Sequence, residues 1–200
     1  MRFEGEWSQQ KNYLDNKVTF TDKGELLDHN DMPVMMKWEA PIMKDAANLI
    51  CSNGGKILNV GFGLGLIDNY IQSYDIAEHW IIEAHPDVQN KMREEGWDKK
   101  HNVKCIFDKW QNVYQDLPKF DGIYYDTWME PQEDFHKVVP MILAPNGRYT
   151  YFEAKEKKVS KLFSKYQIEE HWTHLHEISD NQDYYKVSKV KHKHNLIINK

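Results

Sequence analysis

The chain has 200 residues, of which 40% are hydrophobic and 13% aromatic, so it can bury one sizeable core and we expect a single main folded domain. Its net charge of -5 and pI near 6.1 provide no overall basic field, which argues against DNA or RNA as a partner. The two cysteines form no CxxC pair, which argues against a disulfide framework and against a thiolate metal site. No apolar run approaches the ~20 residues of a membrane span. We therefore expect a cytoplasmic protein that does not enter membranes.

The pattern of polar and apolar residues changes near residue 33, which divides the chain into an N-terminal segment and a main domain. Residues 1–32 are polar with scattered aromatic side chains, and they predict an N-terminal arm or lid. Residues 33–200 are expected to form the folded domain. Within residues 33–55, apolar side chains recur at three- and four-residue spacing, which predicts an amphipathic helix that bends at Pro41 and ends at Gly54 and Gly55.

The middle of the chain alternates apolar runs with helical patterns. Strands are predicted within residues 56–62, 78–85, 102–108, 119–128 and 147–154, and helices within residues 64–74, 86–97 and 134–143. Residues 168–179 and 183–198 alternate polar and apolar side chains around the turn "DNQD", which predicts a C-terminal antiparallel hairpin at the sheet edge. The fold class is therefore α/β and Rossmann-like, with a mostly parallel seven-stranded sheet and helices on both faces.

A glycine-rich loop, "GFGLG", joins the first of these strands to the next helix. Gly61, Gly63 and Gly65 form G-x-G-x-G, whereas the dinucleotide fingerprint places its third glycine one position later, at Leu66. Glu83 ends the next strand, where an acid can bind the two hydroxyl groups of a ribose. These residues favour an adenosine-type ligand over a dinucleotide, and the loop alone also fits a tight turn without a ligand.

Two further acids are candidates for chemistry. Asp126 follows the buried strand "GIYY", and ligands of open α/β sheets bind beyond the carboxyl ends of the strands, so Asp126 is expected to face the same crevice as the glycine loop. Glu39 lies in the predicted helix, where an isolated glutamate is most often solvated.

Histidines are concentrated in the predicted hairpin. A metal site is conceivable there, but polar faces of an edge hairpin are the favoured interpretation, because no carboxylate or cysteine is spaced to complete a site. The residues concerned are His171, His174, His176, His192 and His194.

Several blocks of this sequence carry a more specific signal. The segments "VMMKWEAPIM", "NVGFGLGLID", "HWIIEAHPDVQNKMREEGW", "NVKCIFDKWQ" and "FDGIYYDTW" resemble the guanidinoacetate N-methyltransferase family and its relatives, the fungal protein arginine delta-N-methyltransferases (type IV). The resemblance covers about residues 33–152. It implies a class I methyltransferase domain that binds S-adenosylmethionine, releases S-adenosylhomocysteine and methylates a guanidino nitrogen.

The resemblance also assigns roles to individual residues. It implies cofactor contacts from Met35, Met43, Gly61, Phe62, Gly63, Leu64, Gly65, Leu66, Glu83, Ala84, Trp110, Gln111 and Asp126. Glu83 matches the ribose-binding acid, and Trp110 and Gln111 match the segment that packs against adenine. Asp126 and Glu39 match the carboxylates that hold the guanidino group, and Trp7 corresponds to an N-terminal tryptophan that closes over the site.

The paired acids suit this chemistry on physical grounds. A guanidinium has a pKa of about 12.5 to 13.8 and delocalised lone pairs, so its nitrogen becomes a nucleophile only when the charge is localised and a proton is removed. We expect Asp126 to be the base and Glu39 to orient the group. The cationic sulfonium of the cofactor favours ionised carboxylates, so neither acid needs a raised pKa to be present as a base.

Three positions depart from the family pattern, and two of them leave the acceptor open. Glu153 and Lys155 stand where the guanidinoacetate enzyme is expected to bind the substrate carboxylate, and their charges have opposite effects on such a substrate. Asn59 stands where many methyltransferases carry an acid, which predicts a weaker contact to the cofactor amine. Small guanidino compounds and protein arginine both remain candidate acceptors; another small amine, or a non-catalytic cofactor-binding module, is the alternative. The oligomeric state is open.

Overall fold

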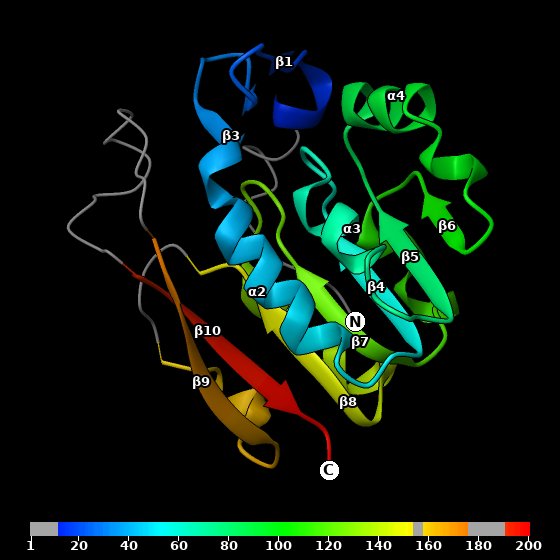
Figure 1. Ribbon diagram of the computed structural model, residues 1–200, viewed down its shortest axis with the longest axis vertical. Coiled ribbons are helices and arrows are strands. Elements are labelled where there is room, and N and C mark those ends of the chain that lie inside the picture. The colour runs from blue at the N-terminus through cyan, green and yellow to red at the C-terminus, as the bar shows by residue number, and fades with distance from the viewer. Residues whose placement is uncertain (1–11, 154–157, 176–190) are drawn as a thin grey trace.

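The computed structural model describes residues 12–153, 158–175 and 191–200, and its centre is one seven-stranded sheet (Figure 1). The strand order is β6-β5-β4-β7-β8-β10-β9. The bounds are β4 (Lys56–Val60), β5 (Glu78–Ile82), β6 (Val103–Ile106), β7 (Phe120–Tyr125), β8 (Leu143–Tyr151), β9 (Gln167–His174) and β10 (Lys191–Ile198). Strands β4 to β8 are parallel, and β10 is antiparallel to both β8 and β9. The predicted Rossmann-like sheet and its C-terminal hairpin are thus confirmed.

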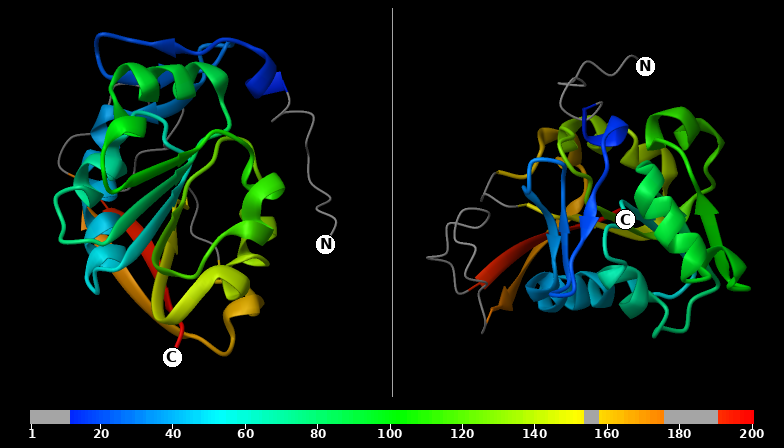
Figure 2. Two further views of the ribbon diagram at one scale, coloured as in Figure 1. Left: turned by 90° about the vertical axis from the view of Figure 1, so that its right-hand side faces the viewer. Right: turned by 90° about the horizontal axis from the view of Figure 1, so that it is seen from above.

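Helices cover both faces of this sheet, as Figure 2 shows from two further sides. One core contains buried side chains of α2 (Ala40–Cys51), α3 (Leu66–Ile71) and α4 (Pro86–Glu94). The other contains side chains of α5 (Trp110–Val113), α6 (Gln132–His136) and α7 (Val139–Ile142). Along β4, Ile57 packs into the first core and Leu58 into the second, as the two-residue period of a strand requires. The described residues also form short 3-10 turns, which are η1 (Lys37–Glu39), η2 (Trp97–Lys99), η3 (Tyr114–Asp116) and η4 (Lys161–Phe163).

The segment before α2 differs from the prediction. Residues 33–36 do not begin a helix but form β3 (Pro33–Met36), the last strand of a small antiparallel sheet with β1 (Thr19–Phe20) and β2 (Glu25–Leu27). Helix α2 begins only at Ala40, so Pro41 lies in its first turn, where a missing N–H is tolerated and no bend results. The spacing of apolar residues wrongly predicted a helix here, because a short strand followed by a 3-10 turn repeats apolar residues at similar intervals.

The hairpin histidines also differ from the favoured interpretation. His192 and His194 are each 1% exposed, because β10 lies inside the sheet and α2 packs across it. His192 stacks on Phe152, and the Nε2 atom of His194 lies 2.8 Å from the Oγ1 atom of Thr173. These two side chains are therefore part of the interior, while His176 and the predicted "DNQD" turn lie outside the described residues.

Among the helices that the structure describes, none is long and apolar enough to cross a membrane.

Candidate functional site

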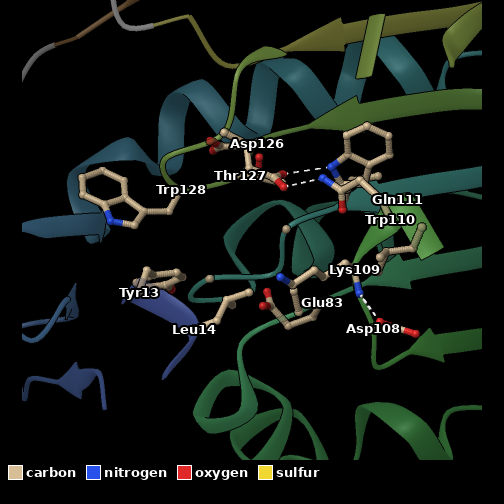
Figure 3. Close-up of a pocket in the computed structure, with 16 residues that line it drawn as sticks. Tyr13, Leu14, Glu83, Asp108, Lys109, Trp110, Gln111, Asp126, Thr127 and Trp128 are labelled. Carbon is tan, nitrogen blue, oxygen red and sulfur yellow. Dashed lines mark hydrogen bonds between the residues drawn. The ribbon is translucent and has the colours of Figure 1, made fainter. Parts of the chain in front are cut away.

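Two adjoining cavities open where β4, β5 and β7 end. Glu83, Ala84, Trp110 and Gln111 line the first cavity, which Figure 3 shows in close-up. Met35, Phe152 and Glu153 line the second. The residues common to both are Gly63, Asp126, Thr127, Trp128 and Glu130. Asp126 therefore lies at the junction, where a ligand in one cavity would meet a ligand in the other.

The glycine loop is built to approach Asp126 closely. Gly61 has a φ of 96°, and a Cβ atom at this position would lie 1.9 Å from the backbone oxygen of Asp126. Any larger residue would push the loop away from the end of β7. The sequence places these two segments 65 residues apart, and the fold brings them into direct contact.

The N–H groups of this loop donate to protein atoms. The N–H of Phe62 donates to Glu83 Oε2 at 2.8 Å, and that of Leu64 lies 3.3 Å from the sulfur of Met35. The N–H of Gly65 donates to the oxygen of Phe62 at 2.8 Å. A pyrophosphate needs a row of N–H groups that point at it. The loop therefore favours a ligand without phosphate, as the position of its third glycine predicted.

Glu83 stands on the floor of the first cavity with both carboxylate oxygens engaged. Its Oε2 accepts from the N–H of Phe62, and its Oε1 accepts from the N–H of His85 at 2.6 Å. Burial raises the pKa of this carboxyl, and the backbone N–H donors oppose that rise. The N–H donors that lower this pKa belong to His85, Phe62, Gly63 and Ala84, so the backbone holds the Glu83 carboxylate in a fixed place at the cavity.

Asp126 and Glu39 are two acids whose charges interact, and of the two Glu39 is buried whereas Asp126 is half-buried and lines both cavities. Glu39 is 1% exposed and accepts the N–H of Met36 at 2.7 Å, so the solvated alternative for this residue is wrong. Burial raises the pKa of Asp126 to about 7. Burial, and next the neighbouring Asp126, hold the pKa of Glu39 well above its ordinary value. In the chain without ligands both pKa values are therefore raised, because burial removes water from the carboxyls. That both acids are ionised beside a cationic sulfonium stays a prediction.

Glu130 is a site residue that sequence analysis did not identify. Its carboxylate accepts from the indole Nε1 of Trp110 at 2.9 Å and from the amide Nε2 of Gln111 at 2.6 Å. The hydroxyl of Tyr125 lies 3.2 Å from the same carboxylate. Glu130 follows Asp126 by four residues in one loop, and that proximity is the signal that could have drawn attention to it. It connects the Trp110 segment to the loop that carries Asp126.

The N-terminal segment also reaches the first cavity. Tyr13 and Leu14 line it, and the Nε2 atom of His85 lies 3.1 Å from the backbone oxygen of Tyr13 and 3.0 Å from that of Asn16. Trp7, the predicted closing aromatic, lies outside the described residues. Among the arm residues that the structure does describe, Tyr13 supplies the aromatic ring at the cavity, and no motif in the sequence singled it out.

Not all predicted cofactor residues reach a cavity. Met43 and Phe62 are fully buried in the first core, and Leu64 and Leu66 pack against the same core. None of these four lines either cavity described above, and neither do the predicted cofactor residue Gly65 and the predicted catalytic residue Glu39. Glu153 does line the second cavity, whereas Lys155 lies outside the described residues.

Asn59 is directed away from both cavities. Its Nδ2 atom lies 2.9 Å from both carboxylate oxygens of Asp68 and donates to the oxygen of Gly61 at 3.0 Å. Asp68 lies in turn 3.1 Å from the Nε2 atom of His79, and all three side chains are fully buried. Asn59 therefore binds the glycine loop through the oxygen of Gly61 and is itself held by Asp68, a buried acid on α3.

This network predicts the effect of restoring an acid at position 59. Asn59→Asp would bury a second carboxylate against Asp68, so it should lower the free energy of unfolding by about 3 kcal/mol at neutral pH. Urea denaturation of the variant would measure this, with Asn53→Asp, in an exposed turn, as the control. Equal stability of the two variants would contradict the proposed contact.

Comparison with known sequences identifies relatives. The sequence model of the family described as guanidinoacetate N-methyltransferase matches residues 2–153. Protein arginine N-methyltransferase 2 of Yarrowia lipolytica is 42% identical over 158 residues, which are 72% of this chain and 33% of that protein. The protein of the same name from Saccharomyces cerevisiae is 37% identical over 158 residues, 72% of this chain and 38% of that protein. The chain thus spans little more than a third of the length of these curated relatives.

Comparison with solved structures bears on the fold alone. Spermidine synthase from Thermotoga maritima has a TM-score of 0.65 and 11% identity, with 92% of this chain and 68% of that chain covered. Precorrin-6y C5,15-methyltransferase from Geobacter metallireducens has a TM-score of 0.58 and 14% identity, with 84% and 91% covered. Both support the Rossmann-like assignment.

Proposed function

The chain belongs to the guanidinoacetate N-methyltransferase family, and on that premise we propose that it transfers a methyl group from S-adenosylmethionine to a guanidino nitrogen. The observation that carries the proposal is the position of Asp126 at the junction of two cavities, near enough to the buried Glu39 for its charge to raise the Glu39 pKa. The first cavity would hold the cofactor and the second the acceptor.

The first cavity fits S-adenosylmethionine in several respects. Glu83 places a carboxylate at the first cavity, where the hydroxyl groups of a ribose would meet it, and Gln111 lines the same cavity. Tyr13 and Trp110 provide aromatic surface, and the loop at Gly63 forms the wall shared with the second cavity. When bound, the cofactor supplies an electrophilic methyl group on a positively charged sulfur.

The acid pair performs the work that a guanidinium acceptor requires. The cationic guanidinium stabilises the charged form of both carboxyls, so their pKa values fall and the carboxylates accept its N–H groups. This fixes the plane of the group and draws its positive charge away from the attacking nitrogen. Asp126 would then take the proton of that nitrogen as the methyl carbon bonds to nitrogen and its bond to the cofactor sulfur breaks, which leaves S-adenosylhomocysteine. The buried Glu39, which lines neither cavity, would support the positive charge through its own negative charge.

The outer part of the acceptor cavity also carries negative charge. Glu153 and Glu130 line it together with Asp126, and none of its described lining residues is a lysine or an arginine. A carboxylate placed close to the guanidino group would be repelled there, whereas a neutral or cationic chain would be accepted. This arrangement favours an arginine side chain or a decarboxylated analogue over guanidinoacetate.

A methyl-transfer assay tests the proposal directly. We expect tritium from labelled S-adenosylmethionine to appear on agmatine or on arginine peptides, and more slowly on guanidinoacetate. Free arginine, whose carboxylate lies farther from the guanidino group, is the intermediate case. Label confined to acceptors without a guanidino group, or binding of the cofactor without any transfer, would overturn it.

A further inference from the structure

We propose that the imidazole of His85 fastens the N-terminal segment over the first cavity and thereby slows the release of a bound cofactor or cofactor product. The inference rests on the proposed function, because it concerns the ligand that this function requires. His85 itself lines neither of the two cavities described above. It is therefore a positioning residue, which acts through the segment that it holds.

Both ring nitrogens of His85 are engaged, and their partners fix the state of the ring. The backbone N–H of Asp87 donates to Nδ1 at 3.1 Å, so this nitrogen carries no proton. The Nε2 atom lies 3.1 Å from the backbone oxygen of Tyr13 and 3.0 Å from that of Asn16, and both oxygens only accept, so Nε2 carries the proton. Burial lowers the pKa of His85, which favours this neutral ring. The imidazole thus donates to the N-terminal segment and accepts from the turn that begins α4.

Two further contacts join the same segments. The rings of His85 and Tyr13 pack with their centroids 4.6 Å apart. The N–H of Val18 donates to Asp87 Oδ2 at 3.1 Å. Residues 15–17 are exposed, whereas Tyr13 is buried. The side of this segment that is buried at Tyr13 is thus the side that meets His85.

His85 also connects this segment to the carboxylate at the cavity. Its backbone N–H donates to Glu83 Oε1 at 2.6 Å. Tyr13 and Leu14 line the first cavity together with Glu83 (Figure 3). A ligand in that cavity lies between two surfaces that His85 holds together, so we expect the segment to open before the ligand leaves.

Two substitutions separate the roles of the two ring nitrogens. His85→Asn places an amide oxygen near the position of Nδ1, and asparagine is a favoured N-cap residue, so α4 keeps the cap that His85 provides. Its shorter side chain does not reach the backbone oxygens of Tyr13 and Asn16. His85→Gln does the reverse, because its amide N–H can reach these oxygens while the helix cap is lost.

The rate at which S-adenosylhomocysteine leaves the chain measures the effect without any turnover. The tritium-labelled compound would be bound to each variant and then chased with an excess of unlabelled compound. We expect His85→Asn to release it roughly tenfold or more faster, because the hydrogen bonds that close the segment are lost, and His85→Gln to stay within about threefold of the unmodified rate. His101→Asn, at an exposed position, is the matched control and should leave the rate unchanged.

Hydrogen exchange reports on the segment itself. Because the N–H of Val18 is bonded to Asp87, binding of S-adenosylhomocysteine should slow its exchange in the unmodified chain and in His85→Gln. In His85→Asn, binding should slow this exchange much less. Urea denaturation should rank the two variants differently, with His85→Gln the less stable because it lacks the helix cap.

The outcomes distinguish this inference from the function on which it rests. If the chain binds S-adenosylhomocysteine but His85→Asn releases it at the unmodified rate, the inference is overturned and the proposed function stands. The inference is also overturned if His85→Gln, the variant without the helix cap, is the one that releases the compound faster. If the unmodified chain does not bind S-adenosylhomocysteine, both are overturned.

Discussion

Asp126→Asn is expected to lower the rate of methyl transfer by ~10² to 10⁴-fold, because the asparagine amide cannot take the proton from the guanidino nitrogen. Cofactor affinity should change only a few-fold, since Glu83 and the Trp110 segment do not depend on the Asp126 charge. Single-turnover transfer and calorimetry on the same preparation would separate the two quantities. Asp116→Asn, an exposed acid in η3, is the control. Transfer at the unmodified rate would remove Asp126 from the mechanism.

Asp126→Asn lowers the rate of transfer, but it should raise the free energy of unfolding of the chain without ligands. The pKa of Asp126 is about 7 in the folded chain, against about 3.9 when unfolded, so the folded state binds this proton more tightly. The stability that this proton provides is complete below pH 4 and is lost as the pH rises to about 7. Each unit of pKa difference corresponds to ~1.4 kcal/mol, so Asp126→Asn should stabilise the chain without ligands by a few kcal/mol at pH 8 and by little at pH 4. Urea denaturation at both pH values would test this, and a variant less stable than the unmodified chain at pH 8 would contradict it.

Glu83→Gln is expected to weaken cofactor binding by roughly 100-fold. The carboxylate accepts the N–H groups of Phe62 and His85 through separate oxygens, so the amide would turn a donor toward one of them. The loop would shift and an acceptor for the ribose would be lost. Transfer at saturating cofactor should fall much less, because Asp126 is unchanged.

Calorimetry with S-adenosylhomocysteine measures this prediction. Glu78→Gln is a matched control at the start of β5, the strand that Glu83 directly follows, since Glu78 pairs with Lys56 and Lys104 at the surface, away from the cavities. Unchanged affinity in the Glu83 variant, or an equal loss in the control, would count against Glu83 as the ribose ligand.

Sequence patterns predicted the central sheet well, because each buried strand can be recognised from its own residues. A short apolar run bounded by turn residues defines a strand such as β4 or β7 without reference to its neighbours. The rule on carboxyl ends of parallel strands then placed Glu83 and Asp126 in one crevice, and both line the first cavity. Prediction failed at residues 33–36, where pairing with β2 rather than local preference decides the structure.

Contacts between distant segments account for the rest of the site. Tyr13 reaches the first cavity because His85, 72 residues later, holds its backbone, and Glu130 matters because of side chains 19 and 20 residues earlier. Asn59 has a partner that the sequence did not indicate, because its Nδ2 atom lies close to both carboxylate oxygens of Asp68. None of these pairs has a spacing that a periodic pattern could reveal.

The sequence by itself therefore determined the family, the α/β class and the acids that the chemistry needs, because residue type and strand order are encoded locally. Tertiary structure alone decided which of those residues meet, that Met43 lies in the core, and that Asp126 is held with a raised pKa. The physical reason is that burial and hydrogen-bond partners depend on what packs against a side chain, and here the partners come from segments far away along the chain.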